Sequence, residues 1–185
     1  MSFVFDFDKA LQTVAFMLRR EHGERMSYLR LVKLLYIADR ESLKETGRPI
    51  SGDFVVAMKH GPVLSRLLDI IKGTDLESPR FSRFVRKEGY QVELVEDPGQ
   101  GKLSRYEIGK LEEVSDRYAT CDEWNLVEIT HDFEEWKRND PGSSSKPIPL
   151  EDILDAVGRS AEKAAILRDR NAELAEDRVF GGTQG

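Results

Sequence analysis

Residues 28–38 constrain the fold of this chain most, because their sequence predicts a helix with apolar side chains on nearly every side. The segment, YLRLVKLLYIA, carries only two charged side chains, those of Arg30 and Lys33. A helix without a polar face is typical of the centre of a domain, where other elements cover every side. Residues typical of helix ends flank the segment: Ser27 before it, and Gly47 and Pro49 after it. We therefore predict a central core helix over residues 28–46.

Apolar residues recur with the 3.6-residue period in six further segments, which we predict to be helices: 8–22, 62–72, 105–120, 122–137, 150–157 and 160–178. Asp8 is the expected cap of the first, and Pro62 takes the first position of the next. Ser104 and Glu107 have the spacing of a capping box. Helices would then cover more than half of the chain, well above the roughly one third typical of globular domains.

Two segments have strand character. Residues 54–59 have the length and content of a buried strand, although Ala57 and Met58 also favour a helix there. Between residues 81 and 96, aromatic and β-branched residues flank a central Glu-Gly pair, a pattern that indicates a hairpin of two strands. The predicted fold class is mainly α with a small antiparallel β-sheet (α+β).

The length of 185 residues suits one compact domain with a small appendage. Residues 1–140 form the expected core domain, and residues 141–149, rich in proline and serine, read as a linker-like loop. Residues 150–180 would supply C-terminal helices that pack on the core, and residues 181–185 are expected to be a frayed tail. Two leucines one heptad apart in the last helix leave pairing with a second chain as an alternative.

Composition argues against several classes of protein. The longest uninterrupted apolar runs have five residues, whereas a membrane-spanning helix needs about 20. The N-terminus lacks the basic start, apolar stretch and cleavage site of a signal peptide, so a cytoplasmic location is expected. The single cysteine, Cys121, cannot form an internal disulfide, and with three histidines the chain has too few soft ligands for a closed zinc site. We expect no metal and no cofactor.

Catalysis has little support in the sequence. There is no Walker loop, no dinucleotide-binding glycine turn, no HExxH and no GxSxG. Cys121 and His131 would serve as nucleophile and base in a hydrolase or transferase, yet no third group is evident to orient them. We therefore favour a non-enzymatic role over this alternative.

Lys59, His60, Gly61 and Pro62 form a motif with two interpretations. They would make a small anion cradle if the predicted helix starts at Pro62, because its free backbone donors would lie beside a lysine and a histidine. The interpretation that we favour is a tight strand-to-helix corner, in which Gly61 supplies an unusual dihedral angle.

Charge is unevenly distributed along the chain, although the net charge is −6. Residues 1–87 hold 16 basic and 11 acidic side chains, residues 88–140 hold 6 and 15, and residues 141–185 hold 6 and 8. The basic first part would meet an acidic protein partner, or the opposite charges would neutralise each other on the folded surface. Basic residues of that part that would be available for contact are Arg19, Arg20, Arg25, Arg30 and Lys33. A nucleic-acid partner is not expected, because these residues are not interleaved with aromatic ones.

Three motifs occur in order: LVKLLYIADR at residues 31–40, GRPISGD at 47–53 and AMKHGPV at 57–63. Further along come Leu103-Ser104, Thr130-His131 and Trp136. Together they resemble the Panacea antitoxin domain, also called SocA-like, over about residues 6–157. The family's signature residues, which are also candidates for partner binding, are matched by Lys33, Tyr36, Asp39, Arg48, Asp53, Lys59, His60, Gly61, Pro62, His131 and Trp136.

The resemblance implies a mostly helical domain with a small sheet, without catalytic activity, that neutralises a toxin in a bacterial or phage toxin–antitoxin pair. In that family one scaffold serves against unrelated toxin types. The implied partner is a cognate toxin protein encoded by the adjacent gene, with a homodimer inside the complex as an alternative arrangement. A proteolytic adaptor that delivers the toxin to a protease is the alternative mechanism. No helix-turn-helix extension is visible, so self-regulation of transcription is not expected.

Three of the signature residues share one face of the core helix. Lys33, Tyr36 and Asp39 follow each other at i, i+3 and i+6. They would either brace the helix against the loop at residues 48–53 or point at a partner. Charged groups inside a core are kept when they are paired, so an internal brace is at least as well supported as direct contact.

Overall fold

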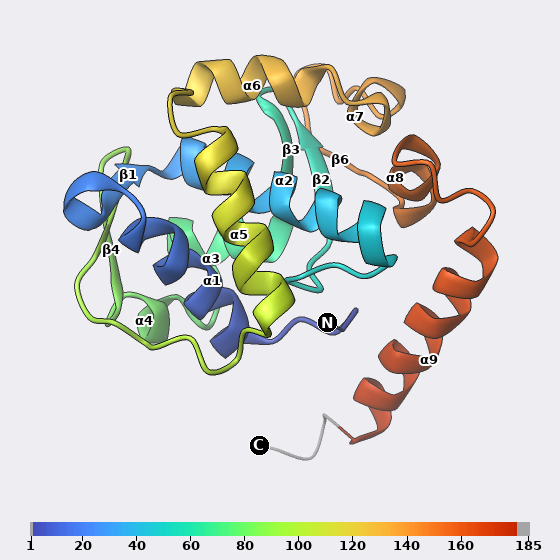
Figure 1. The fold of residues 1–185 in the computed structure, drawn as a ribbon, viewed down its shortest axis with the longest axis horizontal. Helices are drawn as coiled ribbons and strands as arrows, with labels where there is room; N and C mark the ends of the chain where they lie inside the picture. The colour runs from blue at the N-terminus through green and yellow to red at the C-terminus, as the bar shows by residue number, and fades with distance from the viewer. Residues whose placement is uncertain (1, 181–185) are drawn as a thin grey trace.

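The predicted core helix lies at the centre of the molecule. In the computed structural model, which describes residues 2–180, α2 (Tyr28–Thr46) begins at the Ser27 cap and ends at Gly47, as predicted. Every residue from 31 to 39 is buried. Figure 1 shows α2 running through the middle of the fold, with other elements on all sides.

Four helices contact α2: α1 (Phe7–Arg19), α5 (Arg105–Arg117), α6 (Glu123–His131) and, less closely, α8 (Leu150–Ala156). The capping box at the start of α5 is confirmed, since Ser104 accepts from the Glu107 backbone N–H and the Glu107 carboxylate accepts from Ser104 N–H. The start of α1 differs from the prediction. Asp6, not Asp8, is the cap, because its side chain accepts the Lys9 N–H three residues on.

The first predicted helix also ends earlier than residue 22, where we expected its end. α1 ends at Arg19, and η1 (His22–Glu24) is a separate short turn of 3₁₀ helix. The chain then enters β1 (Arg25–Ser27), which the sequence did not indicate. β1 pairs with β5 (Gln91–Leu94), and β5 pairs with β4 (Val85–Glu88), all antiparallel. The hairpin expected between residues 81 and 96 is thus confirmed, as part of a three-stranded sheet.

The second sheet contains the motif at residues 57–63. β2 (Val55–Met58) confirms the predicted strand, and it pairs with β3 (Gly61–Leu64) so that Met58 faces Gly61. Lys59 and His60 are the two residues of the turn between them.

The prediction of a helix from Pro62 is wrong, so residues 59–62 form neither an anion cradle at a helix start nor a strand-to-helix corner. The unusual dihedral angle expected at Gly61 is confirmed, at a corner between two strands. α3 begins only at Ser65 (Ser65–Lys72), and residues 61–64 form a strand. Proline is tolerated there because β3 lies at the edge of its sheet, where a missing N–H leaves no neighbouring strand unpaired.

The linker-like stretch joins this second sheet. β6 (Lys146–Pro147) pairs with β2 on the side opposite β3, and the Ile148 N–H donates to Val55 O at 2.9 Å. Ile148 is also buried, so one apolar residue in a polar, proline-rich segment anchors it to the body.

The predicted helix over residues 122–137 is in fact two. α6 stops at His131, and α7 (Glu134–Arg138) starts after Phe133, whose backbone is extended. α4 (Ser78–Phe81) is a further short turn of helix before β4. Asp122 caps α6 by accepting the Asn125 N–H.

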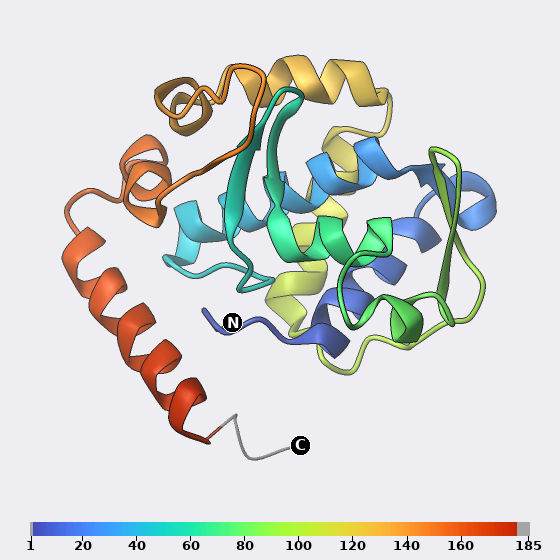
Figure 2. The same ribbon diagram turned by 180° about the vertical axis from the view of Figure 1, so that it is seen from behind.

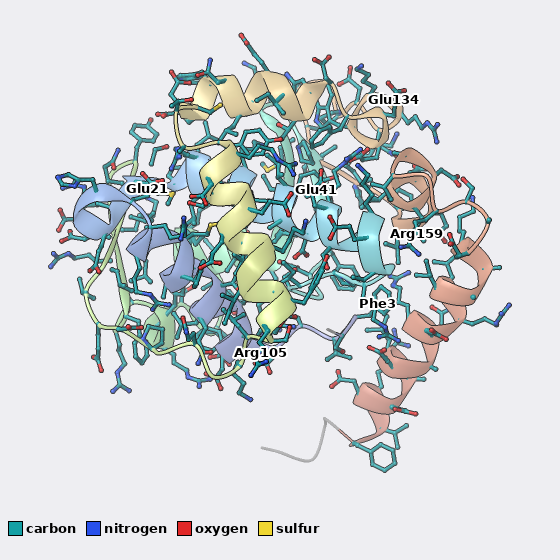
Figure 3. The ribbon with its side chains drawn as sticks, viewed as in Figure 1. Phe3, Glu21, Glu41, Arg105, Glu134 and Arg159 are labelled. Atoms are coloured by element: carbon teal, nitrogen blue, oxygen red, sulfur yellow. The ribbon has the colours of Figure 1, made fainter. Side chains whose placement is uncertain are left out.

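The chain ends in two helices, α8 (Leu150–Ala156) and α9 (Lys163–Phe180). Seen from behind in Figure 2, α9 runs along the outside of the molecule. Only Ile166 of this helix is buried, although Glu173 also accepts hydrogen bonds from Ser2 Oγ and Phe3 N–H. Figure 3 shows Phe3 and Arg159 beside α9 at this junction. The frayed tail predicted at residues 181–185 lies outside the described residues.

The fold class is therefore as predicted: helices dominate, with two small antiparallel sheets beside the central α2. Among the described residues, no helix combines the length and apolar character that crossing a bilayer requires.

Candidate functional site

The signature residues gather around α2 and the β2–β3 hairpin. Lys33 is completely buried, and its Nζ donates to the Pro62 carbonyl oxygen at 2.8 Å. Burial lowers the pKa of this amine from 10.5 to about 7, since no carboxylate lies beside it to favour the charge. Lys33 thus joins α2 to β3 through its side chain.

Gly61 occupies the closest point between the hairpin and the helices. Its φ of 91° lies in the region that favours glycine. A Cβ there would be 2.6 Å from Thr130 Oγ1 and 2.9 Å from Lys33 Nζ, so nothing larger fits without displacement. The glycine lets α2, β3 and α6 meet at one point.

His131 and Trp136 hold the other strand of the hairpin. The His131 Nε2–H donates to Lys59 O at 3.1 Å, and the Trp136 indole N–H donates to Met58 O at 3.2 Å. The two rings stack with their centroids 4.0 Å apart. Burial is the main reason why the pKa of His131 is lowered. The later motifs of the chain therefore fix the turn at residues 59–60 in place.

Tyr36 binds to a residue that the sequence did not single out. Its hydroxyl donates to Glu135 Oε1 at 2.7 Å, and the Arg40 Nε–H donates to the same oxygen at 2.6 Å. Glu135 is wholly buried, and the Arg40 guanidinium lies 4.0 Å from the centre of the Phe133 ring. Burial, and then the negative charge of Glu135, raise the pKa of Tyr36. This cluster fastens α7 to α2.

Asp39 ties α2 to the loop at residues 48–53. Its Oδ1 accepts the backbone N–H groups of Ile50 and Ser51, both at 3.0 Å, and its Oδ2 accepts the Ser51 hydroxyl at 2.5 Å. Burial raises the pKa of this carboxyl to about 6, and the three hydrogen bonds limit the rise.

The two remaining loop residues hold neighbouring helices. Asp53 accepts the Leu67 N–H at 2.9 Å and the Arg66 N–H at 3.2 Å, so it satisfies free donors at the start of α3. Burial raises the pKa of Asp53. Arg48 forms ion pairs with Glu173 and Asp169 of α9.

A pocket of about 500 Å³ opens between α2, β2 and residues 147–151. Its wall is mostly apolar, but Tyr36, Asp39 and Asp53 all reach it. Phe54, which also lines the pocket, is 64% exposed. A smaller pocket of about 120 Å³ lies beside the β2–β3 turn, between the start of α2 and α3.

The candidate catalytic pair is not assembled. Cys121 precedes α6 and His131 ends it, which separates them by about 15 Å at 1.5 Å per helical residue. The Cys121 carbonyl accepts the Arg30 side chain, and His131 is occupied with the hairpin. His60 lies on a turn between strands, away from the helix N-terminus that an anion cradle would need.

The basic first part of the chain is largely neutralised by the fold. Arg19 pairs with Asp97 at 2.5 Å, and Arg20 pairs with Asp116. Arg30 pairs with Glu21, and Lys33 is buried, so of the five residues named for this face Arg25 alone is exposed and forms no ion pair among residues 2–180. The uneven charge along the sequence is therefore largely balanced in the fold, because basic residues of segment 1–87 pair with acidic residues of segment 88–140.

Every signature residue lies within one stretch that matches a known family. The model of the family described as Antitoxin SocA-like, Panacea domain, matches residues 31–137. No curated protein and no solved structure matches the chain.

Proposed function

The chain belongs to the SocA-like antitoxin family with a Panacea domain, and from this premise we propose that it neutralises a protein toxin by binding it directly. The observation that carries the proposal is the use of the signature side chains. Lys33, Tyr36 and Asp39 each bind another part of the same chain and so fasten β3, α7 and the loop at residues 48–53 to α2. A preformed surface of this kind favours protein binding, because little conformational entropy is lost on association.

A non-enzymatic mechanism is part of this proposal. Cys121 and His131 lie at opposite ends of α6, so the candidate nucleophile and base do not form a pair. The proposed action is occlusion of the toxin, or its retention in an inactive form.

The proposed setting follows from the same family. We take the toxin to be encoded by the adjacent gene and the pair to act in the cytoplasm of a bacterium or in phage-infected cells. We also propose that residues 1–140 form the binding core and that α8 and α9 pack on it as an appendage. A homodimer within the complex is the oligomeric arrangement to test.

Co-expression tests the proposal. Each neighbouring reading frame would be induced in a host cell with and without this protein, and growth and co-purification would be measured. The expected result is that one neighbour arrests growth, that this protein restores growth, and that the two purify together. A variant with Cys121→Ser and His131→Ala should restore growth equally if no catalysis is involved. The proposal fails if no neighbouring product is both neutralised and bound.

The toxin level separates the two mechanisms of neutralisation. Direct occlusion leaves the toxin abundant in rescued cells, whereas delivery to a protease shortens its half-life. An immunoblot of the toxin after translation is stopped, with and without this protein, measures the difference.

A further inference from the structure

We propose that the toxin binds through an acidic segment, on a surface around the tip of the β2–β3 hairpin. This inference rests on the proposed function and adds to it a location and a chemistry. We call the surface the hairpin-tip face, and it consists of Tyr28, Lys59, His60, Lys72, Lys87 and Trp124. In Figure 2 the turn of the β2–β3 hairpin lies beneath α6 at the top of the molecule, and the turn of the β4–β5 hairpin lies at the upper right.

The small pocket at the centre of this face is basic. Four basic residues line it, Lys33, Lys59, His60 and Lys72, and no acidic residue lines it. At about 120 Å³ it is smaller than the roughly 300–1,000 Å³ of small-molecule sites. It therefore suits a single side chain of a partner rather than a cofactor.

Aromatic rings lie beside the pocket, with Trp124 and Tyr90 exposed and Tyr28 half-buried. Trp124 is 56% exposed and meets His60 edge to face, with centroids 5.5 Å apart. On the other side Tyr28, which lines the pocket, stacks on Tyr90 at 6.2 Å. Exposed tryptophan and tyrosine are enriched at the energetic centres of protein interfaces. The rings supply apolar contact area around a basic centre.

The lysines of this face are available to contact an acidic partner. Lys59, Lys72 and Lys87 are exposed, and none forms an ion pair among residues 2–180. Lys87 lies 5.4 Å from the centre of the Tyr28 ring, so it joins the same surface. By contrast, Arg19 and Arg20 are already paired with acidic residues of this chain.

The same charges favour a protein partner over a nucleic acid. The whole chain carries a net charge of −6, and a polyanion that extends beyond this face would meet that negative surface. A short acidic segment would contact the local lysines alone. The partner that fits is therefore a protein segment with two or more Asp or Glu residues, one of whose side chains enters the pocket.

Charge reversal provides the test, with the toxin identified by growth rescue as the probe. The triple variant K59E/K72E/K87E reverses the face, and R83E/R105E/R168E makes the same charge change at exposed basic residues elsewhere. We expect the dissociation constant to rise about 100-fold for the first variant and less than about 3-fold for the second. The affinity of the wild type should fall with increasing salt. Circular dichroism and thermal unfolding verify that both variants are folded.

Trp124 offers an independent reading of the same contact. Acrylamide quenching of tryptophan fluorescence should decrease when the toxin binds the wild type. The decrease should be lost in a W124F variant, because the other tryptophan, Trp136, is already packed against His131.

Two outcomes overturn the inference while the proposed function stands: rescue and affinity that are unchanged in the hairpin-tip variant, or quenching that the toxin does not alter. A third outcome is tight binding of a fluorescein-labelled single-stranded oligonucleotide, lost in K59E/K72E/K87E, which would assign the face to nucleic acid instead. If the wild type neutralises no toxin at all, it is the proposed function that fails.

Discussion

Replacing Gly61 by alanine should destabilise the protein far more than the same change at Gly73. Both glycines have a positive φ, 91° and 86°, so each alanine incurs a similar backbone strain of about 1–2 kcal/mol. At Gly73 no atom lies within 4 Å of the added Cβ, whereas at Gly61 two polar atoms lie within 3.0 Å. The difference between the two variants isolates the close packing of the hairpin.

The magnitude follows from the atoms that must move. Lys33 Nζ would leave its hydrogen bond to Pro62 O, and a buried polar group without a partner costs about 1–3 kcal/mol. Overpacking against Thr130 adds about 1–3 kcal/mol. We therefore expect G61A to lose about 3–8 kcal/mol of unfolding free energy, and G73A about 1–2 kcal/mol.

Urea unfolding followed by circular dichroism measures both variants against the wild type. A loss for G61A within about 0.5 kcal/mol of that for G73A would refute the reasoning, since this is the size of ordinary surface effects. A second check is the K33M background, in which one of the two obstructing atoms has changed. G61A should cost less there than in the wild type, because contacting sites are not additive.

Four further predictions concern the same internal contacts. For Asp39→Asn, the wild type should gain stability relative to the variant as the pH falls from about 6 to about 4. The reason is that burial raises the pKa of the native carboxyl from 3.8 to about 6. Urea unfolding across this pH range tests the prediction. For Lys33→Met, the stability of the wild type relative to the variant should increase as the pH rises from about 7 to about 10. The reason is that burial lowers the pKa of the native amine from 10.5 to about 7. A difference in unfolding free energy that does not depend on pH would contradict this. Glu135→Ala should cost about 3–5 kcal/mol in thermal or urea unfolding, since it leaves the Arg40 guanidinium without its buried carboxylate. Glu173→Ala should speed hydrogen exchange in α9 but not in α2, and equal protection in both proteins would show that other contacts hold the helix.

Locally determined elements could be predicted from the sequence. The limits of α2 follow from Ser27 and Gly47, residues that act on the backbone within one turn of their own position. The capping box of α5 is local in the same sense. The first helix shows the limit of this rule, because Asp6 and Asp8 are both residue types that cap helices and the structure has Asp6 as the cap.

Pro62 illustrates why other elements could not be predicted. A proline after a glycine is a common helix start, and nothing nearby in the chain indicates an edge strand. The position of β3 is set by its pairing with β2 and by the side chain of Lys33, which is 29 residues away in sequence. Local propensity favours a helix that starts at Pro62, but long-range pairing with β2 makes the segment a strand.

The candidate site divides in the same way. The motif residues were found because they resemble a family pattern, and all of them lie around α2 and its neighbouring hairpin and loop. Glu135 was missed because it is one of several acidic residues in its segment, and only its buried contact with Tyr36 distinguishes it. Trp124 was also missed, since no periodicity sets an exposed aromatic apart from a buried one.

The edges of the second sheet decide how partners can attach to it. β3 ends the sheet on one side with Pro62, and β6 ends it on the other with only two residues, one of them Pro147. Neither edge offers a regular row of backbone donors, so strand addition by a partner, and the aggregation that accompanies open edges, are both disfavoured. Recognition then depends on surface side chains alone. Such side chains can be exchanged without disturbing the internal hydrogen bonds of Lys33, Tyr36 and Asp39, which would allow one scaffold to be refitted to new partners.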